Sequence, residues 1–241
     1  MILKLSTLLK LSIVHLKIMR TLFFSFLLIF YSLKSISQFA VINDADGYTN
    51  MRELPDSSSK VLYKIRQSEV FFYESLKGSN SDWVKVYCQK NKYALSSSID
   101  DEYLSGYIHK SRLLPLENLK EYKGNDFTFT YDLEKFNLDN KIIDYTDNRV
   151  LNHINGRRIY GTDGNIPKVE VCDIKVIYLK KAIEISNIFF EDVFECDNSF
   201  TIKKDKQNFI VYQWNSDGAG GYFIAWVIGE YKLKQRFIFI P

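Results

Sequence analysis

The cysteines and histidines are the residues best suited to nucleophilic or metal chemistry, and their positions favour neither. A cysteine nucleophile needs a helix start beside it and a histidine brought close to it. Cys172 lies in a strand-like stretch with no histidine after His153, while Cys88 and His109 fall within one short β-rich segment. A zinc hydrolase needs two or three histidines with a carboxylate, but His109 and His153 are far apart and have no motif around them. We therefore predict that the chain is not an enzyme and holds no metal and no cofactor.

Cys172 and Cys196 are candidates for a disulfide, because both lie in the second half of the chain. Such a bridge needs an oxidising compartment, which the N-terminal segment described below indicates. It would leave Cys88 as a free thiol. The alternative is that all three cysteines are small, buried apolar residues.

The glycine-rich segment Ser216–Gly221 is the second stretch that could bind a ligand. Its glycines can adopt positive φ and expose consecutive backbone N–H groups, which suits a carboxylate or phosphate. The residues concerned are Asp217, Gly218, Gly220 and Gly221. However, the segment lacks the spacing and the lysine of a P-loop, so a tight hairpin turn is the competing interpretation. Asp163 and Asp217 could bind a cation, but no series of ligands like that of an EF-hand accompanies them.

Residues 1–37 have the composition of a secretory signal. Basic residues precede an apolar run at 22–33, and Ser35 and Ser37 fit the −3 and −1 positions of a cleavage site. The run is shorter than the roughly 20 residues of a transmembrane helix. We expect 1–37 to be a signal peptide, with 19–37 as its core, and the chain to be exported to the periplasm or beyond the cell. An uncleaved membrane anchor is the alternative, and it would be the chain's contact with a membrane.

The charge and the hydrophobic pattern narrow the class of protein further. Five of the 32 basic residues and none of the 29 acidic residues lie in 1–37, so the remainder has a small acidic excess and does not suggest a nucleic-acid binder. From Phe39 onward, short alternating or β-branched runs are separated by polar turns, and no helical period is sustained. The later runs have short connections, as in an antiparallel meander or sandwich. The sequence predicts an all-β fold after the signal helix.

Residues 38–116 resemble the bacterial SH3-like domain. The resemblance rests on five motifs in order: Asp46-Gly-Tyr-Thr-Asn-Met-Arg52, Pro55 with Ser57-Ser-Ser-Lys-Val61, Ile65-Arg-Gln-Ser-Glu-Val70, Trp83-Val-Lys-Val86 and Gly106-Tyr-Ile-His-Lys-Ser-Arg-Leu113. Two features depart from the family pattern. Ser68 replaces the usual glycine, and the stretch Cys88–Ser105 is longer than the usual hairpin. That stretch is either a mobile loop or one that shapes a recognition surface.

The resemblance implies a small barrel with its own core and a candidate contact surface. The expected core residues are Met51, Val61, Ile65, Val70, Val84, Val86 and Ile108, and Gly106 is expected where two backbones approach closely. Trp83 either covers that core or lines a groove. The candidate ligand-binding residues are Tyr48, Asn50, Trp83, Tyr107 and His109, since aromatic and amide groups beside loops suit peptide recognition.

The remainder divides into a charged linker at 117–125 and a second antiparallel β domain at 126–241. The second domain resembles an uncharacterised all-β domain of exported bacterial proteins, and that resemblance implies no activity. It rests on Tyr160-Gly-Thr-Asp-Gly-Asn-Ile-Pro167, Phe189–Glu195 and Asn215-Ser-Asp-Gly-Ala-Gly-Gly-Tyr222 followed by Ala225-Trp226.

Two functions remain open at this point. The first is an exported, non-enzymatic binding protein whose SH3-like module recognises a peptide or peptidoglycan at the cell envelope. The second is a structural or inhibitory protein, such as an immunity factor, whose second domain binds a protein partner. A wet groove around Trp83 would favour the first function, and an exposed aromatic patch on the second domain would favour the other.

Overall fold

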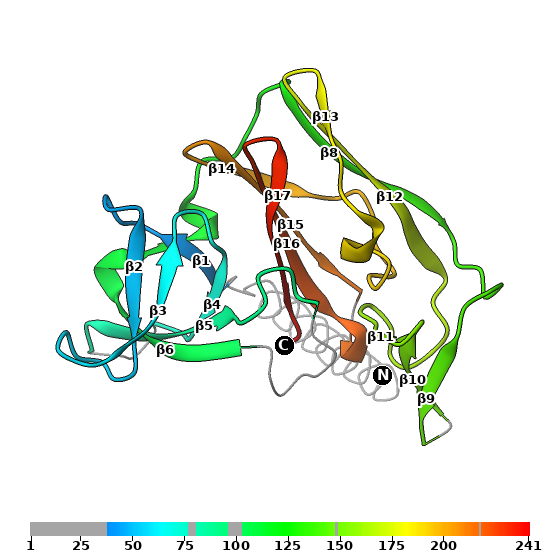
Figure 1. Cartoon of the computed structure of the whole chain (residues 1–241), viewed down its shortest axis with the longest axis horizontal. Helices are drawn as coiled ribbons and strands as arrows, with labels where there is room; N and C mark the ends of the chain where they lie inside the picture. The colour runs from blue at the N-terminus through cyan, green and yellow to red at the C-terminus, as the bar shows by residue number, and fades with distance from the viewer. Residues whose placement is uncertain (1–37, 77–80, 96–102, 148, 217) are drawn as a thin grey trace, which may run out of the picture. The chain divides into compact units, whose positions relative to one another are not determined.

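Antiparallel β-sheets make up the protein, as the strand-like sequence pattern predicts. The computed structural model describes residues 38–76, 81–95, 103–147, 149–216 and 218–241. The expected signal segment 1–37 lies outside the described residues. Within them there is no α-helix, and the strands form four sheets (Figure 1). The all-β class is therefore confirmed. No helix in the described part of the chain is long and apolar enough to cross a membrane.

The first half, residues 38–116, forms one seven-stranded sheet in the order β3-β2-β6-β5-β4-β1-β7. Its strands are β1 Phe39–Ile42, β2 Tyr48–Arg52, β3 Val61–Arg66, β4 Phe71–Tyr73, β5 Trp83–Gln89, β6 Tyr103–His109 and β7 Leu113–Pro115, with the 3₁₀ turns η1 Lys110–Arg112 and η2 Leu116–Asn118. Alternate residues of β2 and β5 are buried, which is the period of a strand with one face on a core.

Six of the seven expected core residues of this half are buried. The exception is Val61, which is 40% exposed at the start of β3. The pairing of β2 with β3 slips between Met51 and Arg52, opposite this end of β3. Because one slip in register turns a side chain to the other face, Val61 points to solvent although its type suits the core.

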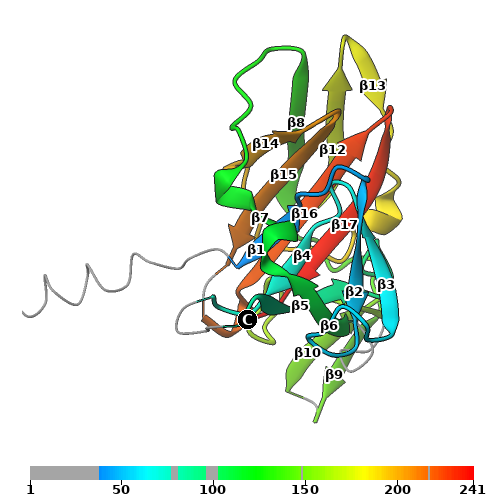
Figure 2. The ribbon, with the colours of Figure 1, turned by 90° about the vertical axis from the view of Figure 1, so that its left-hand side faces the viewer.

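The second half, residues 126–241, contains the other three sheets, β11-β10-β9, β13-β12-β8 and β14-β15-β16-β17. Their strands are β8 Phe127–Lys135, β9 Ile143–Thr146, β10 Val150–Ile154, β11 Arg157–Arg158, β12 Val169–Tyr178, β13 Lys181–Ile183, β14 Thr201–Asp205, β15 Asn208–Asn215, β16 Tyr222–Gly229 and β17 Lys232–Phe239, with the turns η3 Asn187–Phe189 and η4 Gly218–Gly220. The last four strands pair in sequence order as a meander. The small β9–β10 hairpin lies at one end of this half (Figure 2).

Strand β16 is buried along its whole length because both of its faces are covered. Phe223, Ala225 and Val227 pack in a hydrophobic cluster with Phe39 and other residues of the first half. The alternate residues of β16, Tyr222, Ile224, Trp226 and Ile228, pack in a different cluster with the sheet β13-β12-β8. The meander is thus the middle layer between the first sheet and β8–β12, as Figure 1 shows. Each half also keeps a cluster of its own, and the shared cluster joins them.

The stretch 117–125 connects the halves, as expected of a linker, but it is packed. Leu119 belongs to the shared cluster, and the backbone N–H of Tyr122 donates to the carbonyl of Ile202 at 2.9 Å. A single antiparallel bridge joins Glu121 to Lys203 of β14. The described residues from 38 onward accordingly form one compact unit.

Buried polar contacts reinforce the junction between the halves. The Ser68 hydroxyl donates to Asp205 Oδ2 at 2.7 Å and accepts from Asn208 Nδ2 at 2.8 Å. The Gln235 side chain bonds both the N–H and the carbonyl of Val70, at 2.7 and 2.9 Å. These side-chain bonds join two sheets that share no strand pairing. Three buried acceptors at the junction, Gln67 Oε1, Gln89 Oε1 and Asn208 Oδ1, have no partner among the described residues.

Arg236 of β17 forms the largest of these junction contacts. Its side chain is fully buried, and both of its terminal nitrogens bond the Asp192 carboxylate at 2.6 and 2.8 Å. The other guanidinium donors reach the carbonyls of Tyr93, Ala94 and Phe189 at 2.5–2.8 Å. All five donors of the guanidinium therefore have partners, which is the condition for burying an arginine without a large cost.

Candidate functional site

A groove on the first half contains most of the residues expected to bind a ligand. It has a volume of about 460 Å³. Four of the five candidate residues line it, namely Tyr48, Asn50, Trp83 and His109. The remaining lining residues come from the neighbouring loops and strand β2: Asp44, Asp46, Thr49, Arg52, Ser57, Ser111 and Arg112. We call this feature the Trp83 groove.

Strand periodicity and cross-strand pairing bring these side chains together. Tyr48 and Asn50 are two residues apart on β2 and therefore face the same side of the sheet, opposite the buried Met51. Trp83 pairs directly with His109 across β5 and β6, and their rings meet edge to face with centroids 5.7 Å apart. Trp83 is only half-buried, so it lines the groove as one of its walls. Of the two roles that the sequence left open, the structure shows the groove wall.

Three internal contacts hold the loops of the groove. Arg52 Nη1 donates to the carbonyl of Ser59 at 2.6 Å, which fixes the loop that follows β2. Asp44 accepts from the Thr49 hydroxyl at 2.8 Å and pairs with Arg112 at 3.1 Å. Burial acts to raise the pKa of the Asp44 carboxyl, but these hydrogen bonds and the positive charge of Arg112 outweigh it and hold that pKa below its ordinary value. Asp44 therefore remains ionised and tied to the groove wall.

The Trp83 groove contains an acceptor without a partner, an imidazole and an aromatic ring. Asn50 Oδ1 is buried and accepts no hydrogen bond from any described residue. The N–H of Ser111 donates to His109 Nδ1 at 3.3 Å. This contact makes Nδ1 the acceptor, so the neutral imidazole carries its proton on Nε2. Tyr48 presents its ring to Lys64, whose ammonium lies 4.6 Å from the ring centroid. The groove thus offers an acceptor, a donor and aromatic surface.

Tyr107 is the candidate that does not line the groove. It pairs with Arg52 on one side and Lys85 on the other, farther along the same outward face. The sequence reasoning missed Asp44, Asp46 and Arg112, which come from connecting loops. The Asp44-Ala-Asp-Gly47 turn signal could have pointed to the two carboxylates, because Asp residues beside a turn hold loops through backbone N–H groups.

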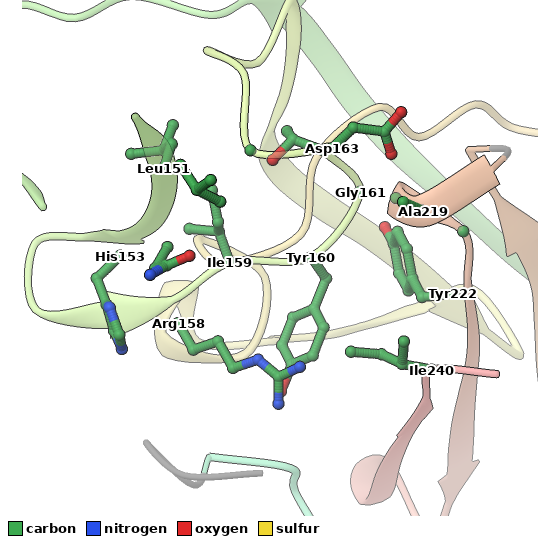
Figure 3. Close-up of a pocket in the computed structure, with 16 residues that line it drawn as sticks. Leu151, His153, Arg158, Ile159, Tyr160, Gly161, Asp163, Ala219, Tyr222 and Ile240 are labelled. Carbon is green, nitrogen blue, oxygen red and sulfur yellow. The ribbon is translucent and has the colours of Figure 1, made fainter. Parts of the chain in front are cut away.

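The glycine-rich segment lines a second cavity, of about 530 Å³, in the second half (Figure 3). Gly218–Gly220 form the turn η4 between β15 and β16, and the N–H of Gly221 donates to the carbonyl of Gly218 at 3.2 Å. Asp217 lies outside the described residues. A Cβ added at Gly220 would come within 2.8 Å of Asp163 Oδ1. The Asp163 carboxylate therefore lies against this turn, and its charge would repel an external anion there.

The three segments that carry the resemblance of the second half meet beside this cavity. Tyr160 bridges to Val193, and a Cβ on Gly161 would clash with the carbonyl of Phe194. His153 and Arg158 pair across β10 and β11 and extend from the cavity wall to the same side in Figure 3. The sequence pattern did not mark His153 and Arg158 as site residues, because strands β10 and β11 are too short to show a clear alternation.

The three cysteines are free in the structure, so the Cys172–Cys196 disulfide considered from the sequence is not formed. Cys172 is exposed at a register shift of β12, whereas Cys196 is buried with its Sγ 3.0 Å from the Tyr222 hydroxyl. Burial raises the pKa of the Cys196 thiol to about 12, which keeps it protonated. Cys172 thus lies at the surface, while Cys196 packs in the core of the second half.

Metal-ligating residues do not gather anywhere in the described part of the chain: no group of three or more His, Cys, Asp or Glu there could hold an ion. Comparison with known proteins adds no further information about the Trp83 groove, since no family model, curated protein or solved structure matches this chain.

Proposed function

We propose that the chain is an exported, non-enzymatic binding protein whose first half is an SH3-like module that recognises a peptide or cell-wall peptide at the envelope. The observation that carries the proposal is the Trp83 groove. Four residues chosen from the sequence motifs converge there, and one of them, Asn50, has a buried acceptor without a partner. The signal-like N-terminus supports export, and the positions of the cysteines and histidines support the absence of catalysis.

The polar atoms of the groove suit the backbone of an extended peptide. Asn50 Oδ1 would accept from a ligand N–H, and His109 Nε2 would donate to a ligand carbonyl. Trp83 supplies a flat apolar wall for a side chain or a Cα, at little cost in conformational entropy. A ligand that provides these bonds removes the desolvation penalty of the unpartnered acceptor.

Retention on purified peptidoglycan and calorimetry with soluble cell-wall peptides would test the proposal. We expect Trp83→Ala to weaken binding by about 30-fold, as for an aromatic residue central to an interface. Asn50→Ala should weaken it by about 5- to 10-fold, the value of one hydrogen bond. Trp214→Ala is the matched control, because Trp214 is 46% exposed on β15 and does not line the groove.

Two results would refute peptide recognition by the Trp83 groove. One is a wild-type protein that is retained no better than an unrelated folded protein. The other is binding that Trp83→Ala and Asn50→Ala leave unchanged while circular dichroism shows both variants folded.

A second candidate function, a protein partner held by the second half, is favoured by exposed apolar side chains on the β9–β10 hairpin. Ile142, Tyr145 and Val150 are 70%, 45% and 47% exposed. Co-purification from the native host would separate the two functions. A partner lost with Ile142→Asp and Tyr145→Asp but kept with Trp83→Ala would support the second function.

A further inference from the structure

A cavity at the junction of the two halves carries an excess of positive charge. This junction cavity has a volume of about 560 Å³, within the range of small-molecule sites. Its basic residues are Arg66 from the end of β3, Lys92 from the loop after β5, and Lys232 and Lys234 from β17. These segments are distant in sequence, so the cluster exists only because the halves pack together.

The two carboxylates that line the cavity already have partners. Glu69 accepts from the Tyr63 hydroxyl at 2.9 Å and from the backbone N–H of Arg66 at 3.1 Å. Glu230 pairs with Lys234 at 3.1 Å. Among the described residues, the side chains of Arg66, Lys92 and Lys232 form no ion pair at contact distance, although Lys92 lies over the Tyr93 ring. Four cations therefore face two carboxylates whose acceptor sites are partly occupied.

One buried acceptor beside the cavity has a fixed identity. Gln67 lines it, and Gln67 Nε2 donates to the Asp205 carboxylate at 2.6 Å. A carboxylate only accepts, so this bond determines the orientation of the amide. Gln67 Oε1 must then be the remaining amide atom, and it is buried without a partner among the described residues. A ligand that offers a donor at this point would satisfy it.

We propose that the junction cavity binds a small anion that also carries a hydroxyl donor, of the class of hydrogen phosphate or a phosphorylated polyol. Arg66, Lys92 and Lys232 supply charge-assisted bonds to the phosphate oxygens. Gln67 Oε1 accepts from the hydroxyl. This site is separate from the Trp83 groove and does not depend on the function proposed for it.

Calorimetry on the purified protein with three probes tests the chemistry of the ligand. At about pH 8, hydrogen phosphate and sulfate are both dianions of similar size, but only hydrogen phosphate has an O–H group. We expect hydrogen phosphate to bind at least about fivefold more tightly than sulfate, from one hydrogen bond. Glycerol phosphate is the third probe, and tighter binding than that of hydrogen phosphate would identify a phosphorylated polyol as the ligand. Equal affinity for sulfate and hydrogen phosphate would refute the role of Gln67.

Charge-removing variants locate the site. Arg66→Gln and Lys232→Gln change exposed side chains without ion pairs, so both variants should fold, and each should weaken phosphate binding by about 5- to 10-fold. Lys60→Gln removes the same charge from an exposed lysine outside the cavity and should bind as the wild type does. An equal loss with Lys60→Gln, or no loss with either cavity variant, would overturn the proposal. Trp83→Ala should leave phosphate binding unchanged, which separates this test from that of the groove.

Discussion

At the scale of the residue, Ser68 shows how one substitution in a motif acquires a structural role. The family pattern that the first half resembles has glycine at this place, and Ser68 adopts a φ of +65°, in the left-handed region that favours glycine. This backbone conformation is less favourable for serine than for glycine, but the serine hydroxyl forms hydrogen bonds with Asp205 and Asn208 of the second half. The departure from the pattern thus coincides with a contact between the halves.

Two substitutions at Ser68 separate the effect of its hydroxyl from that of its backbone. Ser68→Ala keeps the left-handed backbone and loses both bonds, so we expect it to lower the free energy of unfolding by about 1–3 kcal/mol. Ser68→Gly loses the same bonds but relieves the backbone, and it should be more stable than the alanine variant by about 1 kcal/mol. Urea unfolding measures both values. An alanine variant as stable as the wild type would show that the hydroxyl contributes nothing.

At the scale of the element, β6 is held close to β2 by the absence of a side chain at Gly106. A Cβ at this position would lie 2.7 Å from the carbonyl oxygen of Arg52 and 2.8 Å from Met51 Cγ. The close approach expected from the sequence is confirmed. The requirement for glycine at this position is steric and does not come from the backbone conformation, because Gly106 does not have a positive φ.

Gly106→Ala should therefore destabilise the protein through overpacking, by about 1–3 kcal/mol. Gly106→Val should cost more, since it adds two further carbons in the same confined space. Thermal unfolding measures the change, and Ser105→Ala is the control because Ser105 is exposed on the same strand. If Gly106→Ala and Ser105→Ala have the same stability, β6 does not depend on this close contact.

At the scale of the whole molecule, the two halves share a packed junction. The stretch Cys88–Ser105, which is longer than in the family that the first half resembles, supplies much of the junction. Its residue Ala94 is buried in the cluster of the second half, and the carbonyls of Tyr93 and Ala94 accept from Arg236. Residues 96–102 of this stretch lie outside the described residues. The described part of the stretch packs against the second half. Neither interpretation of the sequence, a mobile loop or a loop that shapes a recognition surface, predicted this contact.

We expect replacement of Arg236 to lower the stability of both halves together, so that they unfold in one transition. Arg236→Met leaves the buried Asp192 with Arg157 as its charged partner and removes the donors to three carbonyls, so we expect a loss of about 3–5 kcal/mol. Hydrogen–deuterium exchange should show that residues 38–116 and 126–241 lose protection together. The exposed Arg149→Met is the control. Continued protection of the first half while the second exchanges would show that the halves are independent domains.

The sequence alone determined the features that depend on neighbouring residues. Alternation with a period of two identified the strands, and it placed Tyr48 and Asn50 on one face because successive side chains of a strand point in opposite directions. Turn residues marked the β15–β16 connection for the same local reason. Four of the five residues chosen for the candidate site therefore line one groove, although the function of that groove stays a prediction.

The tertiary structure decided what covers each face. A hydrophobic run such as Phe223–Ile228 shows that a strand is buried on both sides, but it does not name the two partners. The Ser68–Asp205 bond joins residues 137 positions apart, and the basic residues of the junction cavity come from three separate segments. Packing likewise leaves Cys172 exposed and buries Cys196 in the core of the second half, so the two thiols are free. Contacts of this kind arise when whole sheets pack against each other. Because the separation of two residues along the chain says almost nothing about whether they meet in such packing, only the folded structure shows these contacts.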